Sequence, residues 1–198
     1  MQIEALTNDF ARQAAELHIK NIPTGFISSL GINFVTALYG CIAEDNNSFS
    51  FVAVDDGKVI GFVAFSTNLS KLYKYVGLKR GFKFGFILAR KMVSFRVIKK
   101  VFDNIFYPSK MAKMNLPDAE LLSIVVASQG RGKGVANQLV DAGFAECRKR
   151  SIERVKVLVA AGNEPANKLY QKCGFELATQ IESHGVKSNI YVRDLTRG

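Results

Sequence analysis

Alternating apolar and polar positions predict one β-hairpin clearly, between Ser48 and Ser66. Apolar residues recur at every second position on both sides of Asp56-Gly57, a dipeptide that favours a two-residue turn. Short runs rich in β-branched residues predict further strands. The expected strands cover residues 3–5, the two arms of the hairpin, and residues 119–126, 155–159, 175–182 and 187–195.

Apolar residues spaced three and four apart predict the helices between these strands. The first follows Thr7, a good N-cap residue, and continues through His18. A second helix is expected from about Ser28, with Leu30 and Phe34 on its apolar face. Further helices are expected over the second half of residues 71–107, over residues 135–149 and over residues 164–173.

These elements alternate as in a mixed α/β domain. The chain has 198 residues, of which 48% are hydrophobic and 22% charged, a composition typical of a globular protein with a buried core. We therefore expect a single domain over residues 1–198. In its second half a strand, a glycine-rich turn, a helix and another strand follow one another.

The positive charge is concentrated in one segment, residues 71–113. The segment contains twelve Lys and Arg residues and a single acid, so it carries +11, whereas the whole chain carries +10. Nine aromatic residues lie in the same segment. Such an asymmetry favours an anionic partner: a phosphate-bearing substrate, a lipid surface or a nucleic acid. Nucleic acid is the least favoured of these partners, because the chain has no recognition-helix or stacking-platform motif.

The cysteine and histidine residues exclude two further classes of protein. Cys41, Cys147 and Cys173 lie far apart and form no C-x-x-C pair, which indicates a reducing, cytoplasmic location and no disulfide framework. The only histidines, His18 and His184, lie at opposite ends of the chain, so no metal site is expected. We also expect no signal segment and no membrane-spanning helix, since no run of about 18 apolar residues occurs.

The turn after the expected strand 119–126 is a candidate binding site. Arg131-Gly132-Lys133-Gly134-Val135-Ala136 leads into the helix expected over residues 135–149. Glycines let backbone N–H groups point at a ligand, and a helix N-terminus adds unpaired donors and a positive dipole end. Arg131 and Lys133 add full charge. Together they predict a cradle for a diphosphate, the alternative being a turn that binds nothing.

A second motif, N-x-x-A-x-x-L-Y-x-x-x-G-F, begins at Asn163 and ends at Phe175. With R-x-x-G-x-A at Arg131, and a strand between the two, it resembles the GNAT superfamily of N-acetyltransferases over residues 119–195. A second register of the first motif begins at Gln129. The register from Arg131 is preferred because it places the last motif position inside the first helical turn.

The resemblance implies the GNAT fold, a mixed six- to seven-stranded sheet flanked by helices, with the acetyl-CoA-binding half at residues 119–195. It implies an acyltransferase that moves an acetyl group from acetyl-CoA to a primary amine by direct attack. The pantetheine arm would pair with one strand, and an N–H of that strand would polarise the thioester. The residues implied to contact acetyl-CoA are Ile124, Val125, Val126, Arg131, Gly132, Lys133, Gly134, Val135, Ala136, Asn163, Ala166 and Tyr170.

Two residues are implied to be catalytic. Tyr170 matches the family's usual general acid, which protonates the leaving thiolate, the alternative being a core tyrosine beside Phe175. Glu120 lies eleven residues before Arg131, as does the base of the histone-acetylating branch. Its alternatives are an exposed carboxylate at the start of a strand and a base role filled by water. His18 and His184 are weaker candidates for the base, expected to be structural or exposed.

The sequence does not specify the acceptor, which the resemblance leaves as a small amine, an amino sugar or a peptide amine. The family's usual acceptor site corresponds to residues 21–29 and 183–187. Residues 67–118 form an insertion where the family usually has a short link between its third and fourth strands. The insertion is interpreted as a cap helix with a basic outer face, as a site for a phosphorylated or lipid-linked acceptor, or as a membrane attachment.

An alternative to the enzyme is a non-catalytic module of the same fold. It would bind an anionic membrane surface or partner through residues 71–113, at the inner face of the membrane. A homodimer also remains open.

Overall fold

The computed structural model describes residues 1–91, 114–183 and 186–196. Its strands are β1 (Gln2–Ala5), β2 (Ser48–Asp55), β3 (Lys58–Ser66), β4 (Glu120–Val126), β5 (Arg154–Ala160), β6 (Glu176–Ser183) and β7 (Val186–Asp194). Its helices are α1 (Asn8–Asn21), α2 (Phe26–Ser29), α3 (Ile32–Glu44), α4 (Leu69–Lys91), α6 (Val135–Lys149) and α7 (Glu164–Lys172), with a 3₁₀ turn η1 (Ser128–Gly130).

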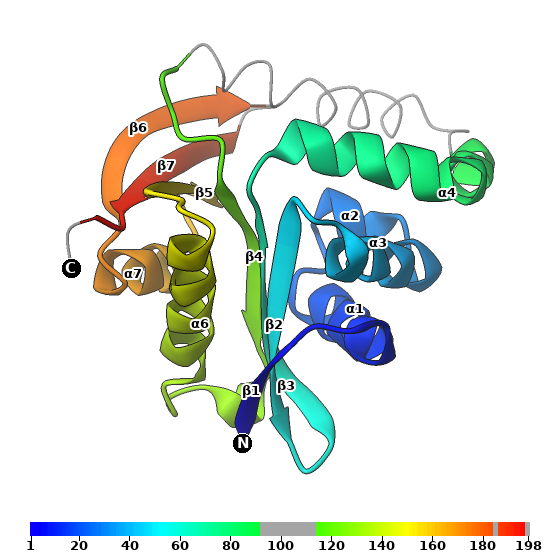
Figure 1. Cartoon of the computed structure of the whole chain (residues 1–198), viewed down its shortest axis with the longest axis horizontal. Helices are drawn as coiled ribbons and strands as arrows, with labels where there is room; N and C mark the ends of the chain where they lie inside the picture. Colours follow the sequence, from blue (N-terminus) through cyan, green and yellow to red (C-terminus); the bar gives the residue numbers. More distant parts are fainter. Residues whose placement is uncertain (92–113, 184–185, 197–198) are drawn as a thin grey trace.

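All seven strands form one mixed sheet in the order β1-β2-β3-β4-β5-β7-β6. Neighbouring strands are antiparallel, except β4 and β5, which are parallel. Helices α1, α2, α3 and α4 lie on one face of the sheet, and α6 and α7 lie on the other (Figure 1). The expected α/β fold with six to seven strands is confirmed.

The β2–β3 hairpin has the predicted two-residue turn, with Asp55 opposite Lys58, and an irregularity between Ala53 and Val54 shifts the register so that Phe49 lies opposite Phe65. Asp56 and Gly57 adopt φ values of 48° and 71°, as a two-residue turn between twisted strands requires. Phe49 and Phe65 also stack, with ring centroids 5.2 Å apart. Helices cover both faces of the hairpin, so alternate residues of both arms are buried in different cores.

The helix expected from about Ser28 is two helices. The short α2 ends at Ser29, and α3 begins at Ile32 after Gly31, whose φ of 88° interrupts the helix. Leu30 and Phe34 still pack together in one small cluster, as their spacing predicted.

Helix α6 begins and ends at the predicted residues. Gly134, with a φ of 76°, precedes its first turn, and Leu139, Val140 and Cys147 are buried against the sheet. At Gly143 the helix approaches β3 so closely that a Cβ atom would overlap the Phe65 ring. The position of α6, and of the turn before it, is therefore set by direct packing on the hairpin.

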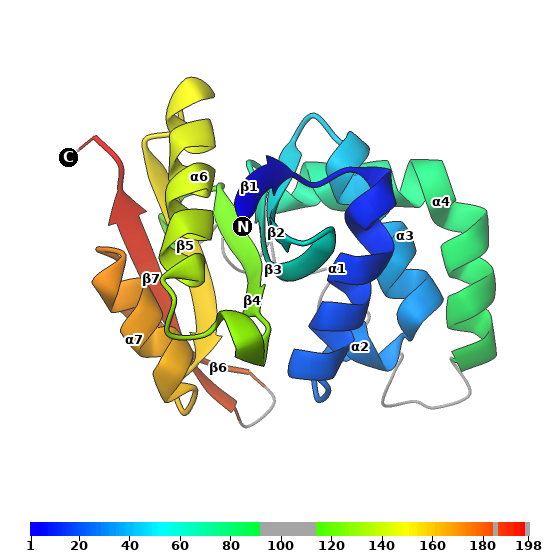
Figure 2. The ribbon, with the colours of Figure 1, turned by 90° about the horizontal axis from the view of Figure 1, so that it is seen from below.

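The insertion begins with α4, which starts at Leu69 and so earlier than the helix expected in the second half of residues 71–107. Leu69 and Leu72 are buried beside α3, whereas Lys71 and Lys74 are exposed on the outer side of α4. Figure 2 shows α4 lying along α3, away from α6 and α7. The prediction for residues 92–107 lies outside the described residues. None of the helices described is long and apolar enough to cross a membrane.

Candidate active site

β4 and β5 separate after a very short contact. They pair only through Glu120 with Lys156 and Leu121 with Val157, although β4 stays paired to β3 as far as Val126. Beyond Leu121, β4 and β5 diverge and leave a gap between them. The backbone of β4 along residues 122–126 faces this gap, and no described strand pairs with it on that side. Such an edge presents backbone donors and acceptors with which an extended ligand can pair.

A β-bulge in β4 decides which of its side chains face α1, α3 and α4. Leu121 pairs with Phe65 and Ser123 with Ala64, so Leu122 is an extra residue in the strand. The inward and outward alternation shifts by one position at such a bulge. As a result, Glu120, Leu122 and Ser123 all line one cavity, which strict alternation would not allow.

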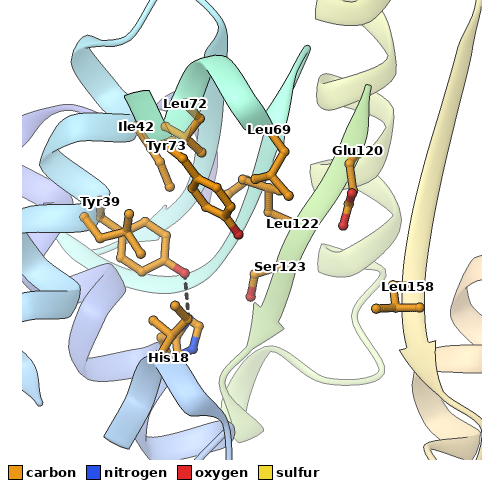
Figure 3. Close-up of a pocket in the computed structure, with 13 residues that line it drawn as sticks. His18, Tyr39, Ile42, Leu69, Leu72, Tyr73, Glu120, Leu122, Ser123 and Leu158 are labelled. Carbon is orange, nitrogen blue, oxygen red and sulfur yellow. Dashed lines mark hydrogen bonds between the residues drawn. The ribbon is translucent and has the colours of Figure 1, made fainter. Parts of the chain in front are cut away.

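This cavity, of about 220 Å³, lies between β4 and the helices α1, α3 and α4 (Figure 3). Leu158 of β5 also lines it, so the cavity extends to the point where β4 and β5 separate. Its described lining is His18, Ile27, Leu38, Tyr39, Ile42, Ala64, Leu69, Leu72, Tyr73, Glu120, Leu122, Ser123 and Leu158.

Glu120 is buried rather than exposed at the start of its strand. Its Oε2 atom lies 3.6 Å from Nζ of Lys156, and the two side chains are only 8% and 6% exposed. Lys156 also donates hydrogen bonds to the carbonyl oxygens of Pro117 and Asp118. The ammonium charge favours the ionised carboxylate, the form that a general base needs.

The other polar groups of the cavity are uncharged at neutral pH. His18 Nδ1 lies 2.7 Å from the Tyr39 hydroxyl, and burial lowers the pKa of His18 to about 4. Burial raises the pKa of Tyr39. Burial, with the Glu120 charge, raises the pKa of Tyr73 to about 12. His18 is thus a buried, neutral part of the wall, and His184 lies outside the described residues.

The glycine-rich turn lies at the end of β4. Gly132 and Gly134 have φ values of 74° and 76°, and a Cβ atom on either would meet nothing within 4 Å, so the space beside them is open. Arg131 donates to the Val126 carbonyl at 3.3 Å and to Asn21 Oδ1 at 3.0 Å, linking the turn to β4 and α1. The first N–H groups of α6 have no partner within the helix, as at every helix start.

Of the remaining turn residues, Lys133 is exposed. Val135 is buried, and Ala136 lies in the first turn of α6. On β4, Val125 is buried toward α1, and Ile124 and Val126 pack on the other face of the sheet. The chain thus brings the implied cofactor-binding residues 124–126 and 131–136 to adjacent places at the end of β4.

Helix α7 holds the second motif. Asn163 caps the helix, because its Oδ1 accepts the N–H of Ala166 at 3.3 Å. Tyr170 is buried on the α6–α7 face, edge-on to Phe175 at 5.7 Å, and burial raises its pKa. Tyr170 and Glu120 therefore lie on opposite faces of the sheet, and Tyr170 keeps its proton at neutral pH.

Sequence reasoning missed Asn167, which joins α7 to the sheet. Its Nδ2 atom donates to the Ala160 carbonyl at 3.1 Å, and its Oδ1 accepts from Asn189 at 2.7 Å and from the Tyr191 hydroxyl at 3.0 Å. The repeat of asparagine one helical turn after Asn163 was the available signal. Lys156, Tyr39 and Tyr73 carried no comparable signal, because they lie in separate segments of the chain.

The segments expected to bind the acceptor contribute little to this cavity. Of residues 21–29 only Ile27 lines it, and of residues 183–187 the structure describes the backbone at both ends but not His184 and Gly185. The wall comes instead from α3, α4 and β4.

The chain belongs to the acetyltransferase (GNAT) family, whose model matches residues 19–175. Among curated proteins, mycothiol acetyltransferase of Corynebacterium glutamicum is 36% identical over 75 residues. That alignment covers 37% of this chain and 25% of the relative, so the chain matches about a quarter of that protein's length.

Solved structures share the fold over nearly the whole chain. An N-acetyltransferase from Staphylococcus aureus has a TM-score of 0.65 at 18% identity, covering 98% of both chains. A ribosomal-protein-alanine N-acetyltransferase from Brucella melitensis has a TM-score of 0.63 at 15% identity, covering 98% of this chain and 99% of that one. NAA60 of Arabidopsis thaliana in complex with acetyl-CoA has a TM-score of 0.61 at 18% identity, covering 98% of both chains.

Family and fold together define the class of the protein. By family and fold it is a GNAT-type acetyltransferase domain, and NAA60, a solved structure of the same fold, is in complex with acetyl-CoA. The resemblance based on the two motifs is confirmed.

Proposed function

We propose that the protein transfers the acetyl group of acetyl-CoA to a primary amine by direct attack. One observation carries this proposal. The cavity that contains Glu120 extends to the separation of β4 and β5, which lies next to the glycine-rich turn. A nucleophile in the cavity and a thioester in the gap would therefore meet.

The donor would be held by three parts of the chain. The diphosphate would bind the N–H groups of residues 132–136, with Arg131 and Lys133 nearby. The pantetheine arm would pair with the β4 edge along residues 124–126, as an added strand. Because Asn163 uses its Oδ1 atom to cap α7, its Nδ2 atom is the group that would reach the arm.

The chemistry would then use groups from both faces of the sheet. Glu120 would take a proton from the acceptor ammonium, and the neutral amine would attack the thioester carbonyl carbon. The N–H of Val125 or Val126 would stabilise the tetrahedral oxyanion, an effect of about 3–4 kcal/mol for a single donor in other enzymes. When the C–S bond breaks, Tyr170 would give its proton to the leaving thiolate, and the attacking nitrogen would release its second proton to water, which leaves a neutral amide and CoA. Proton exchange with water would then restore Glu120 and Tyr170.

Calorimetric titration with acetyl-CoA, using CoA as a control, tests the donor half. We expect micromolar binding with one site per chain. A screen of amines by release of free CoA thiol then tests the transfer. If the protein does not bind acetyl-CoA at millimolar concentration, the proposal is wrong, because the glycine-rich turn then binds no diphosphate.

A second function is supported by the outer side of α4. Lys71, Lys74 and Lys79 are exposed there, and Leu78 is 88% exposed between them. A basic helix side with an exposed apolar residue suits an anionic lipid surface. Sedimentation with anionic and neutral vesicles tests this: we expect salt-sensitive binding to the anionic ones, and binding to neither would exclude it.

A further inference from the structure

We propose that the acceptor is a primary amine carried by an apolar, uncharged body, and that the cavity beside Glu120 selects it. This inference rests on the proposed function, because it takes the cavity beside Glu120 as the acceptor site. It names one class among the amines that the family resemblance leaves open.

The walls of the cavity are mostly hydrocarbon. Eight of the thirteen described lining residues are Ile, Leu or Ala. They come from α2, α3, α4, β3, β4 and β5, so they surround the space rather than form one side of it. An apolar body gains free energy from leaving water for such walls, whereas a polyhydroxylated body would lose hydrogen bonds to water.

Glu120 is the one charged side chain among the described lining residues. His18 is neutral because burial lowers its pKa to about 4. Tyr39 and Tyr73 keep their protons because burial raises the pKa of each. Because Lys156 pairs with this acid, the cavity has little net charge, which suits an acceptor whose only charge is the ammonium that Glu120 would deprotonate.

Among the side chains that the structure describes, the cations near the cavity are not directed at it. Lys71, Lys74 and Lys79 lie on the exposed side of α4. Lys156 is already bound to Glu120 and to the carbonyl oxygens of Pro117 and Asp118. Among the described residues, the cavity therefore offers no cation to a phosphate or carboxylate on the acceptor.

The size of the cavity also limits the acceptor. Its volume of about 220 Å³ lies below the roughly 300–1,000 Å³ of sites for drug-sized ligands. It suits one aryl ring or one branched alkyl chain. This body could belong to a free amine or to the first residue of a peptide, and the experiment separates the two sources.

The test compares amines at saturating acetyl-CoA, with thiol release as the readout. The apolar probes are 2-phenylethylamine and isoamylamine, and the polar ones are ethanolamine and glucosamine. The anionic probes are β-alanine and phosphoethanolamine. The peptides Leu-Gly-Gly and Glu-Gly-Gly complete the set. We expect kcat/KM to be at least about tenfold higher for the apolar members, since one buried methylene group is worth about that much.

A pair of variants assigns this preference to the cavity. Leu122→Asn changes a half-buried lining residue, and Leu78→Asn makes the same change on the exposed side of α4. We expect L122N to lower kcat/KM for 2-phenylethylamine about tenfold more than it lowers kcat/KM for ethanolamine. L78N should leave both unchanged. A merely destabilised protein would lose both activities in parallel.

The outcomes separate this inference from the proposed function. Transfer that prefers ethanolamine, glucosamine or the anionic amines would overturn the inference and keep the function. If no amine is acetylated, the function fails, and calorimetry of the CoA-loaded protein with 2-phenylethylamine decides the inference. Binding that L122N weakens would support it, and no binding would overturn it.

Discussion

Lys156 lies 3.6 Å from Glu120, and both side chains are almost fully buried. The pair also sits on one of the two residue pairs that join β4 to β5. The carboxylate of the proposed base, Glu120, therefore also helps to hold β4 against β5, where the two parts of the sheet meet. Stability and activity should respond together when it is changed.

The first prediction concerns this ion pair. Glu120→Gln leaves a buried ammonium without its counter-charge, so we expect the free energy of unfolding to fall by about 3–5 kcal/mol. Turnover should fall about 10²–10⁴-fold through loss of the base. Urea unfolding and steady-state kinetics measure the two effects.

The double variant Glu120→Gln/Lys156→Met is the control for this prediction. It removes both charges, so its loss of stability should be smaller than the sum of the two single losses. Its turnover should stay low. Recovery of turnover in the double variant would show that the carboxylate is structural only.

The second prediction concerns Tyr170. Tyr170→Phe keeps the ring that packs edge-on to Phe175 and removes only the hydroxyl. We expect turnover to fall about 10²–10⁴-fold with little change in the affinity for acetyl-CoA. Kinetics and calorimetry on the same sample check it. Normal turnover would leave Tyr170 as a core residue.

The third prediction separates the glycine-rich turn from an ordinary turn. Gly134 and Gly57 have φ values of 76° and 71°, and both have open space at the Cβ position. Substitution by Ala should cost each about 1–2 kcal/mol of stability, the strain of a left-handed residue. Only Gly134→Ala should also weaken acetyl-CoA binding, and equal affinities in the two variants would refute the cradle.

The fourth prediction concerns acid stability. Burial lowers the pKa of His18 from 6.5 to about 4, so the unfolded chain binds a proton at this residue before the native protein does. Native stability should therefore fall as the pH drops from 6.5 towards 4, by about 3 kcal/mol from this group.

His18→Gln provides the comparison for that effect. The variant has no imidazole to protonate, so its loss of stability between pH 7 and pH 4 should be smaller by that amount. Urea unfolding at several pH values measures it. Identical slopes for the two proteins would contradict the prediction.

Local signals in the sequence predicted the hairpin and helix α6 well. Helix α6 was placed to the residue, because Gly134 must adopt a positive φ just before its first turn. The hairpin followed from Asp56-Gly57. In both cases a short stretch of chain determines the conformation, with little contribution from distant residues.

The remaining features depend on contacts between distant segments. The bulge at Leu122 has no turn residue to mark it, and the break at Gly31 falls inside a continuous apolar pattern. The cavity unites residues from His18 to Leu158, so no local pattern could show it. Glu120 was identified by its spacing from Arg131, but its partner Lys156 lies on another strand.

The short contact between β4 and β5 joins two parts of the sheet, β1–β4 and β5–β7, at a narrow seam. The pantetheine arm of the cosubstrate, lying in that seam, would hydrogen-bond to residues 122–126 on the side facing β5. With the cosubstrate bound, the sheet would then be continuous from β4 to β5. Ligands that bind only the native state stabilise it in proportion to the logarithm of their concentration. The cosubstrate would then take the place of a strand beside β4. Amide hydrogen exchange along β4 would slow as the acetyl-CoA concentration rises.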